Sequence, residues 1–170
     1  GRDITGMPAE DISMLGISHV PEERRVFGNL TVEENLHLAE VVMNRSNTWR
    51  RDLEASHEGL STGEIYEDFP RLGERKQQLA IARALKQNTD LLMLDEPYEG
   101  LAPQIIQTVE AAVERIRDEG TTVLLVEQNA VAAMKIADRC YIVDQGSIVF
   151  DGTASELRED EATRERYLGV

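Results

Sequence analysis

The four consecutive apolar residues Leu91-Leu92-Met93-Leu94 constrain the fold more than any other part of the sequence. A short, continuous apolar run of this kind is typical of a strand that is buried on both faces of a sheet. A helix is predicted after it, from Pro103 at the first helical position to a stop at Gly120. Residues 121–126 are then predicted to form a second buried strand. Strand, helix and strand at this spacing make the crossover unit of a parallel sheet, so the sequence predicts an α/β fold.

Other periodic or capped segments extend this assignment along the chain. A helix is predicted over residues 31–44, where Thr31 and Glu34 have the spacing of a capping box. Residues 45–63 are polar and are predicted to be a loop. The remaining predicted elements are a helix at 74–86, a helix at 129–137, a hairpin of strands 141–143 and 148–150, and a terminal helix capped by Thr153 and Glu156. The mostly helical part before residue 90 is therefore expected to be an insertion in the α/β fold.

The composition is that of an acidic globular protein. The chain has 170 residues, 41% of them hydrophobic, with a formal charge of −14 at pH 7. This length and hydrophobic content suit one compact domain, or part of a larger one. The acidic charge argues against direct binding to nucleic acid, which demands a basic face. Only 3 of the 18 basic residues are lysines, a bias that resembles proteins of salt-accumulating halophiles. An ordinary acidic protein is the alternative.

The sequence predicts a soluble protein of a reducing compartment. Cys140 is the single cysteine, so no intramolecular disulfide is possible. It lies in residues 140–143, which are predicted to form a buried strand, so we expect a core residue rather than a nucleophile. No apolar run approaches the roughly 18 residues that a membrane span needs. Any connection to a membrane is therefore expected to run through a partner.

Two adjacent carboxylates follow the apolar run and are the strongest local signal for chemistry. Asp95 and Glu96 stand where a buried parallel strand ends, and ligands bind at that edge of such sheets. Phosphoryl transfer from a nucleotide uses this combination, because one carboxylate holds Mg²⁺ and a second group orients the attacking water. The alternative is a strand that merely ends in solvated acids.

Five segments in the expected order resemble the ATP-binding subunits of ABC transporters, and the resemblance covers nearly the whole chain. Residues 91–96 resemble the Walker B motif. Residues 77–85 are similar to the helix after the signature motif. The other three matches are residues 16–22 with the strand entering the Q-loop, residues 99–102 with the D-loop, and residues 126–129, Val-Glu-Gln-Asn, with the switch loop.

The resemblance implies roles for four residues. Asp95 is expected to be the Mg²⁺ ligand and part of the cofactor-binding site, and Glu96 the catalytic base. Glu22 stands at the Q-loop position where most members have glutamine, which implies contact with the cofactor. Gln128 stands in the switch loop where many members have histidine, which implies a catalytic role.

The resemblance also implies a fold and its division. The chain is expected to be a partial ABC-type, RecA-like nucleotide-binding domain with a mostly helical insertion. Residues 1–22 would end the first part of the RecA-like core. Residues 23–87 would form the helical subdomain, and residues 88–170 the second part of the core with a C-terminal hairpin and helix.

Finer features resemble the ATPases of branched-chain amino-acid importers, although urea importers share much of the pattern. These features include residues 21–36, residues 100–103, the switch loop and the closing Tyr167-Leu168-Gly169. The resemblance implies the cofactors ATP and Mg²⁺. It also implies transmembrane permease subunits and a second ATP-binding subunit as partners, no nucleic acid, and a cytoplasmic position at the inner face of the membrane.

Two parts of the family pattern are missing from the sequence. No Gly-x-x-x-x-Gly-Lys-Ser/Thr occurs, although a backbone cradle of this kind holds the phosphates. Residues 1–6 resemble a turn that follows the family's early strands, so the chain is expected to be truncated at its N-terminus. Residues 69–76 run directly into Gln77, so we expect an internal deletion of the signature motif. A degenerate signature at residues 71–75 is the alternative.

Taken together, the sequence predicts an ATP-binding and ATP-hydrolysing subunit of an importer for branched-chain amino acids, present as an incomplete chain that is inactive alone. Two alternatives stay open. The chain is a non-catalytic remnant or regulatory binder, or it is a soluble or urea-type ABC ATPase. Nucleotide binding separates the first alternative from the main prediction, and co-purification with permeases separates a soluble ATPase from it.

Overall fold

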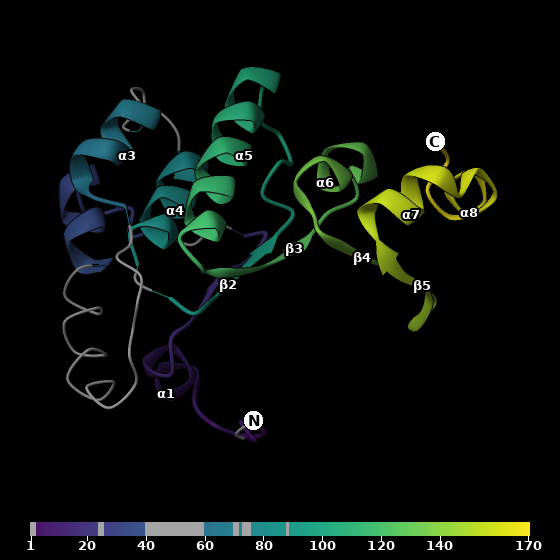
Figure 1. The fold of residues 1–170 in the computed structure, drawn as a ribbon. Helices are drawn as coiled ribbons and strands as arrows, with labels where there is room; N and C mark the ends of the chain where they lie inside the picture. The colour runs from purple at the N-terminus through teal and green to yellow at the C-terminus, as the bar shows by residue number, and fades with distance from the viewer. Residues whose placement is uncertain (1–2, 24–25, 40–59, 70–71, 73–75, 88) are drawn as a thin grey trace. The chain divides into compact units, whose positions relative to one another are not determined.

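The computed structural model describes residues 3–23, 26–39, 60–69, 72, 76–87 and 89–170. The chain divides into two compact units, Gly1–Val126 and Glu127–Val170. The first unit contains a helix at residues 32–39 together with α1 (Ala9–Met14), β1 (Ile17–Val20), α3 (Thr62–Asp68), α4 (Lys76–Leu85), β2 (Leu91–Asp95), α5 (Pro103–Asp118) and β3 (Thr122–Val126) (Figure 1). The second contains α6 (Ala130–Ile136), β4 (Arg139–Asp144), β5 (Ser147–Thr153), α7 (Ala154–Glu159) and α8 (Glu161–Tyr167).

A three-stranded parallel sheet in the order β1-β2-β3 organises the first unit. β2 is the central strand, with Leu91 opposite Ile17 of β1 and opposite Thr122 of β3. The strand–helix–strand crossover predicted around residue 100 is therefore present as β2, α5 and β3. The α/β class predicted from the sequence is confirmed.

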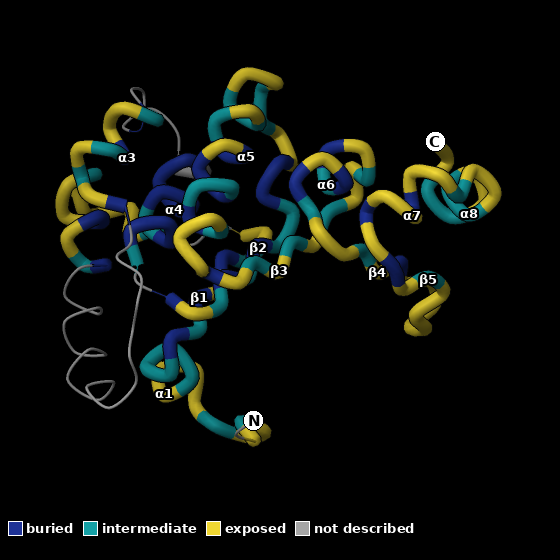
Figure 2. The backbone as a smooth tube through the Cα atoms, in the orientation of Figure 1, coloured by how far each residue is buried: buried dark blue, intermediate teal, exposed yellow. Residues whose placement is uncertain are grey.

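Helices α4 and α5 contact each other and pack on the sheet, α4 at β1 and α5 at β3 (Figure 1). The predicted stripe of α4 is buried, with Leu85 1% exposed, and so is the stripe of α5, with Val109 fully buried. Leu92 and Leu94 of the central strand β2 are also buried, at 0% and 1% exposed. The core of this unit therefore lies between the sheet and these two helices, where Figure 2 shows buried backbone.

Helix starts follow the local sequence closely. The predicted capping box is present, because Glu34 N–H donates to the Thr31 hydroxyl and Thr31 N–H donates to the Glu34 carboxylate, 2.7 Å away. Pro103 is at the start of α5, as predicted, and the helix ends at Asp118 before Gly120, whose φ is +107°.

Two helices of the first unit, α1 and α3, were not predicted, and the single terminal helix that was predicted is divided into α7 and α8. The signal for α3 was present in the sequence, since Ser61 and Glu64 form a second capping box with the same geometry. The side chain of Arg115 on α5 bridges to Asp68 at the end of α3, with 2.5 Å between nitrogen and oxygen. This ion pair fixes α3 against α5.

Two strands predicted to be buried are partly exposed, and these predictions are wrong. In β3, Leu124 and Val126 are 45% and 52% exposed, because the described residues cover one face of this edge strand and leave the other open. In β4, Ile142 is the buried residue, while Val143 is 66% exposed. Cys140 is only partly buried, and burial raises the pKa of its thiol, as expected of an unreactive residue. A continuous apolar run in a sequence does not show whether one face of the strand is covered or both faces are.

The second unit is a hairpin covered by short helices. β4 and β5 pair antiparallel around Gln145 and Gly146, whose φ angles are +48° and +79°. Two positive φ angles in a two-residue loop are the geometry of a type I′ turn. Met134, Ile142 and Leu157 form the core of this unit. The predicted hairpin is thus confirmed, and so is the cap of the terminal helix by Thr153 and Glu156.

Several predictions lie wholly or partly outside the described residues. They concern the end of the helix at 31–44, most of the loop at 45–63, and most of the segment 69–76, after which the signature motif was predicted to be deleted. The division at residues 1–22, 23–87 and 88–170 stays a prediction. None of the described helices combines the length and apolar character that crossing a membrane requires.

We predict that Leu92→Ala destabilises the first unit strongly. The side chain is fully buried in the central strand, so its loss removes apolar contacts and leaves a cavity, at a cost of about 3 kcal/mol in the free energy of unfolding. Chemical denaturation followed by circular dichroism measures this change. Leu124→Ala is the matched control, because Leu124 is 45% exposed and its loss should cost well below 1 kcal/mol. Equal losses in the two variants would contradict the core described above.

We also predict that the α7 cap weakens in acid. Hydrogen bonds from the backbone N–H and then the hydroxyl of Thr153 lower the pKa of Glu156 in the folded chain. The stabilisation that the ionised Glu156 carboxylate gives to the cap is therefore fully present above the pKa of about 4.3 that this group has in the unfolded chain. It is lost as the pH falls through the lower pKa of Glu156 in the folded chain. Glu156→Gln keeps the cap geometry but should remove this part of the pH dependence. Urea midpoints measured from pH 6 to pH 3 test this. An identical pH profile in the variant would refute it.

Candidate functional site

The carboxyl ends of the three parallel strands meet at one edge of the sheet, where three predicted site residues lie. Asp95 is the last residue of β2 and pairs with Val126, the last residue of β3. Glu96 follows directly, and Glu22 follows the end of β1 by two residues. Ligands of open α/β sheets bind at this edge. The structure therefore places Asp95 and Glu96 at a strand end, as the sequence predicted, and it places Glu22 at the same edge of the sheet.

The backbone of Glu96 has a left-handed conformation, with φ +46°. Residues other than Gly, Asn and Asp rarely adopt this conformation. Such backbone strain persists where surrounding contacts hold it in place. Here the Glu96 N–H donates to the Val126 carbonyl at 2.8 Å, and its carbonyl accepts from Glu99 N–H at 3.2 Å. The chain therefore leaves the line of β2 sharply at Glu96, and its carboxylate departs from the alternating pattern of the strand.

Three carboxylates converge beyond the strand ends. Oxygens of Glu22, Glu96 and Glu99 lie within 4.8 Å of one another. Glu22 and Glu99 are exposed, and Glu96 is partly buried. Carboxylate oxygens at this spacing suit a hard divalent cation such as Mg²⁺. The donor set of this edge therefore fits the cation that accompanies a nucleotide.

Asp95 does not belong to the converging group, although the resemblance makes it the Mg²⁺ ligand. It is partly buried at the end of β2. Glu99 belongs to the group, and the sequence analysis did not single it out as a site residue. The sequence signal that could have identified Glu99 is its position three residues after Glu96. A tight turn follows β2, and in it the Glu99 N–H donates a hydrogen bond to the Glu96 carbonyl. The role of Asp95 stays a prediction.

Gln128 belongs to the second unit. It is exposed and follows the end of β3 by two residues. Its neighbour Asn129 caps α6, with its side-chain oxygen accepting from Ala132 N–H at 3.1 Å. The switch segment is therefore anchored to the start of α6, and the catalytic role of Gln128 stays a prediction.

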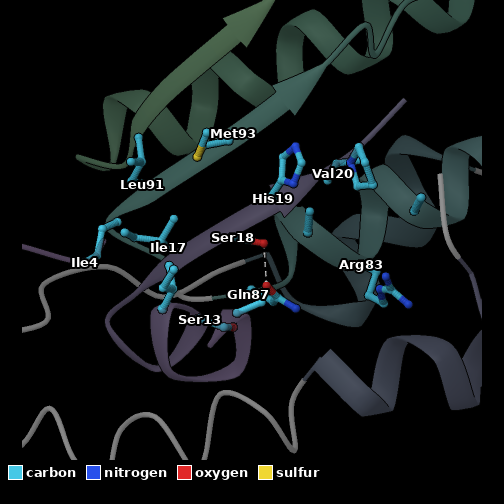
Figure 3. A pocket seen from close by; sticks show the side chains of 15 residues that line it. Ile4, Ser13, Ile17, Ser18, His19, Val20, Arg83, Gln87, Leu91 and Met93 are labelled. Carbon is cyan, nitrogen blue, oxygen red and sulfur yellow. Dashed lines mark hydrogen bonds between the residues drawn. The ribbon is translucent and has the colours of Figure 1, made fainter. Parts of the chain in front are cut away.

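A separate hollow of about 640 Å³ lies beside β1 (Figure 3). Ile17, Leu91 and Met93 supply apolar walls. The Ser18 hydroxyl, which also lines it, donates a hydrogen bond to the side-chain oxygen of Gln87 at 2.7 Å. None of the described residues that line the hollow is acidic, so it is distinct from the carboxylates at the strand ends.

Comparison with known proteins gives a consistent family. The family model described as ABC transporter matches residues 1–99. The chain is 42% identical to the high-affinity branched-chain amino acid transport ATP-binding protein BraG of Pseudomonas aeruginosa, across 99% of this chain and 73% of that protein. It is 34% identical to the probable branched-chain amino acid transport ATP-binding protein LivF of Archaeoglobus fulgidus, across 100% and 73%. It is 30% identical to the lipopolysaccharide export system ATP-binding protein LptB of Escherichia coli, across 98% and 71%.

The alignments with BraG and LivF extend over 181 and 183 positions, more than the 170 residues of this chain. Both relatives therefore have residues at internal positions where this chain has none. This agrees with the predicted internal deletion.

Solved structures support the fold. An ATP-binding subunit of an ABC transporter superposes with a TM-score of 0.69 at 24% identity, covering 99% of this chain and 71% of that one. A nucleotide-free ATP-binding cassette from an ABC transporter also gives a TM-score of 0.69, at 21% identity over 98% and 72%. The sequence relatives, the family model and the fold agree, and the chain belongs to the ATP-binding subunits of ABC transporters.

Proposed function

We propose that this chain is the ATP-binding subunit of an importer for branched-chain amino acids. The observation that carries the proposal is the 42% identity to BraG along 99% of the chain. LivF follows at 34%, whereas the lipopolysaccharide exporter subunit LptB is 30% identical. The order of these identities favours branched-chain amino acids over lipopolysaccharide as the cargo.

The edge of the sheet supports a role in phosphoryl transfer. Bound ATP with Mg²⁺ would supply the transferable phosphoryl group and the cation that neutralises it. Asp95 would offer an oxygen ligand to the cation, as the resemblance implies, and Glu22 and Glu99 lie close enough together to offer others. Glu96 would accept a proton from the attacking water, since its backbone conformation takes its carboxylate off the line of β2. Gln128 would orient the reacting groups from the switch segment.

The phosphate cradle is the part of the ATP site that these 170 residues do not contain, because no Gly-x-x-x-x-Gly-Lys-Ser/Thr occurs in them. Backbone N–H groups of such a loop and its lysine normally hold the phosphates. The carboxylates present here repel phosphate when no cation is bound. The 170 residues therefore supply the cation and water-activating side of the site, and nucleotide affinity depends on the missing loop.

The proposed setting is a transporter. The chain would work with transmembrane permease subunits and a second ATP-binding subunit, at the cytoplasmic face of the membrane. The similarity to BraG and LivF, both branched-chain amino acid transport ATP-binding proteins, supports this assembly. Selection of the cargo would then reside in the other subunits.

We predict that the 170-residue chain binds Mg-ATP with a dissociation constant weaker than 1 mM and has negligible ATPase activity. The physical reason is the absence of a phosphate cradle. Isothermal titration calorimetry and phosphate release measure the two quantities. The control is a chain extended at its N-terminus by a phosphate-binding loop with the Gly-x-x-x-x-Gly-Lys-Ser/Thr pattern, which should bind more tightly. Micromolar affinity of the 170 residues, or turnover that Glu96→Gln abolishes, would contradict the prediction.

In a reconstituted importer that contains the phosphate-binding loop, we predict that Glu96→Gln lowers ATPase activity and leucine uptake 100-fold or more, because losing a general base costs about 10²–10⁴-fold in rate. Glu119→Gln, an exposed carboxylate at the end of α5, is the control and should leave both rates unchanged. Uptake of radiolabelled leucine, valine and urea in proteoliposomes identifies the cargo. Uptake of urea without uptake of leucine or valine would contradict the proposal that branched-chain amino acids are the cargo.

A further inference from the structure

The strand β3 forms one edge of the parallel sheet, and some of its backbone groups point away from β2. Thr122 N–H donates to the Asp90 carbonyl at 2.9 Å, so the backbone of Thr122 is directed toward β2. Backbone groups alternate in direction from one residue of a strand to the next, so those of Val123 and Leu125 point to the opposite side. Among the residues that the structure describes, no strand pairs with β3 on that side. The N–H and carbonyl groups of Val123 and Leu125 are therefore directed at an open edge.

β3 also has none of the features that keep an edge strand from pairing with another chain. Charged side chains, proline and β-bulges serve this purpose in most sheets. Residues 121–126 are Thr-Thr-Val-Leu-Leu-Val, without charge or proline, and β3 pairs with β2 in continuous register. The other described edge strands differ, because α1 contacts β1, and β4 and β5 carry Arg139, Asp144 and Asp151. β3 is therefore the described strand best suited to accept a further strand.

The exposed side chains of β3 are apolar as well. Leu124 and Val126 are 45% and 52% exposed, on the same face of the sheet as Met93, which pairs with Leu124. An added strand would shield the outer flanks of these side chains while it satisfied the backbone of Val123 and Leu125. In strand addition, main-chain hydrogen bonds give affinity and side chains give specificity. Both contributions are available at this edge.

The edge is compatible with pairing to a second copy of itself. In an antiparallel pair centred on Leu124, this residue stands opposite its own equivalent. Val123 of each copy then stands opposite Leu125 of the other, and their outward N–H and carbonyl groups face each other as a hydrogen-bonded pair. Beyond the strand, Glu127 stands opposite Thr121, so this register brings no like charges together. Like charges directly opposite each other would destabilise such a pair.

The charge of the whole chain makes such pairing dependent on salt. At a formal charge of −14, two copies repel each other at low ionic strength. The Debye length falls from about 10 Å at 0.1 M salt to about 3 Å at 1 M. Because the edge itself is uncharged, salt weakens the repulsion between the copies but leaves the contact unchanged. Pairing is therefore expected to strengthen as the salt concentration rises.

We propose that β3 is an interaction surface for a second copy of this chain, which pairs with it antiparallel about Leu124 and joins the two sheets into one. The inference goes beyond the proposed function, because the contact uses the side of β3 that faces away from β2. Antiparallel pairing directs the carboxyl ends of the two sheets in opposite directions, so their acidic residues do not meet. The contact is therefore separate from any assembly at the acidic edge.

The first test measures the mass of the chain at about 100 μM by size-exclusion chromatography with light scattering, in 0.1 M and in 2 M KCl. At high salt the mass should approach twice the 19.1 kDa of one chain, and at low salt it should stay near that of one chain. Amides 123 and 125 should exchange more slowly with deuterium at high salt, whereas amide 124, which faces β2, should change less. The mass of one chain at both salt concentrations overturns the proposal. Assemblies larger than two chains also overturn it, because the two-fold contact uses both edges.

Charge swaps at Leu124 test the register. Leu124→Lys and Leu124→Glu each place like charges opposite each other in the pair, so each should raise the dissociation constant of the dimer about tenfold or more. Sedimentation at about 0.5 M KCl measures this constant. An equal mixture of the two variants should associate at least threefold more tightly than either alone, because position 124 pairs with itself. Val143→Lys is the matched control, since Val143 is 66% exposed on β4, and it should change the constant less than twofold.

A proline tests the backbone contact. Leu125→Pro removes an outward N–H, and edge strands tolerate proline where the N–H faces solvent, so the pairing of β3 with β2 is kept. The dimer at 2 M KCl should be lost while the circular dichroism spectrum is retained. If this variant does not fold, the charge swaps decide, because they leave the backbone unchanged. A dimer that persists in both Leu124 variants with the affinity of the unaltered chain lies at another surface and overturns the proposal.

Discussion

The parallel pairing of β2 with β1 and β3 is the interaction on which the rest of the first unit depends. Leu92 and Leu94 are buried between the sheet and the helices α4 and α5, and their burial fixes the register of the ladder. Because the strands are parallel, all three carboxyl ends come to one edge. The same pairing therefore creates the core and collects the acidic residues that follow the strands.

The ladder also determines where the chemistry can take place. Its last backbone bond, from Glu96 N–H to the Val126 carbonyl, holds Glu96 in a left-handed conformation that an isolated chain would avoid. This turn brings the oxygens of Glu22, Glu96 and Glu99 within 4.8 Å of one another. Carboxylate oxygens at this spacing suit a hard divalent cation, which supports the proposed magnesium site.

Local signals in the sequence predicted the elements well where one short-range interaction decides the structure. The capping pairs Thr31–Glu34 and Thr153–Glu156 are present as expected, and so is the hairpin turn at Gln145-Gly146. The exposed side of β3 and the outer positions of β4 were mispredicted, because apolar content does not say whether a second layer covers a strand. Leu124 and Val143 show the difference, at 45% and 66% exposed.

By itself, the sequence determined the class of fold, the family motifs and the position of Asp95 and Glu96 at a strand end. These follow from periodicity, caps and the order of residues, which are properties of neighbouring positions. Only the tertiary structure decided that Glu99 joins Glu22 and Glu96, and that Asn35 clamps the turn carrying Phe27. Such contacts depend on how a turn closes and on which side chain is enclosed when helices pack, and no spacing in the chain specifies them.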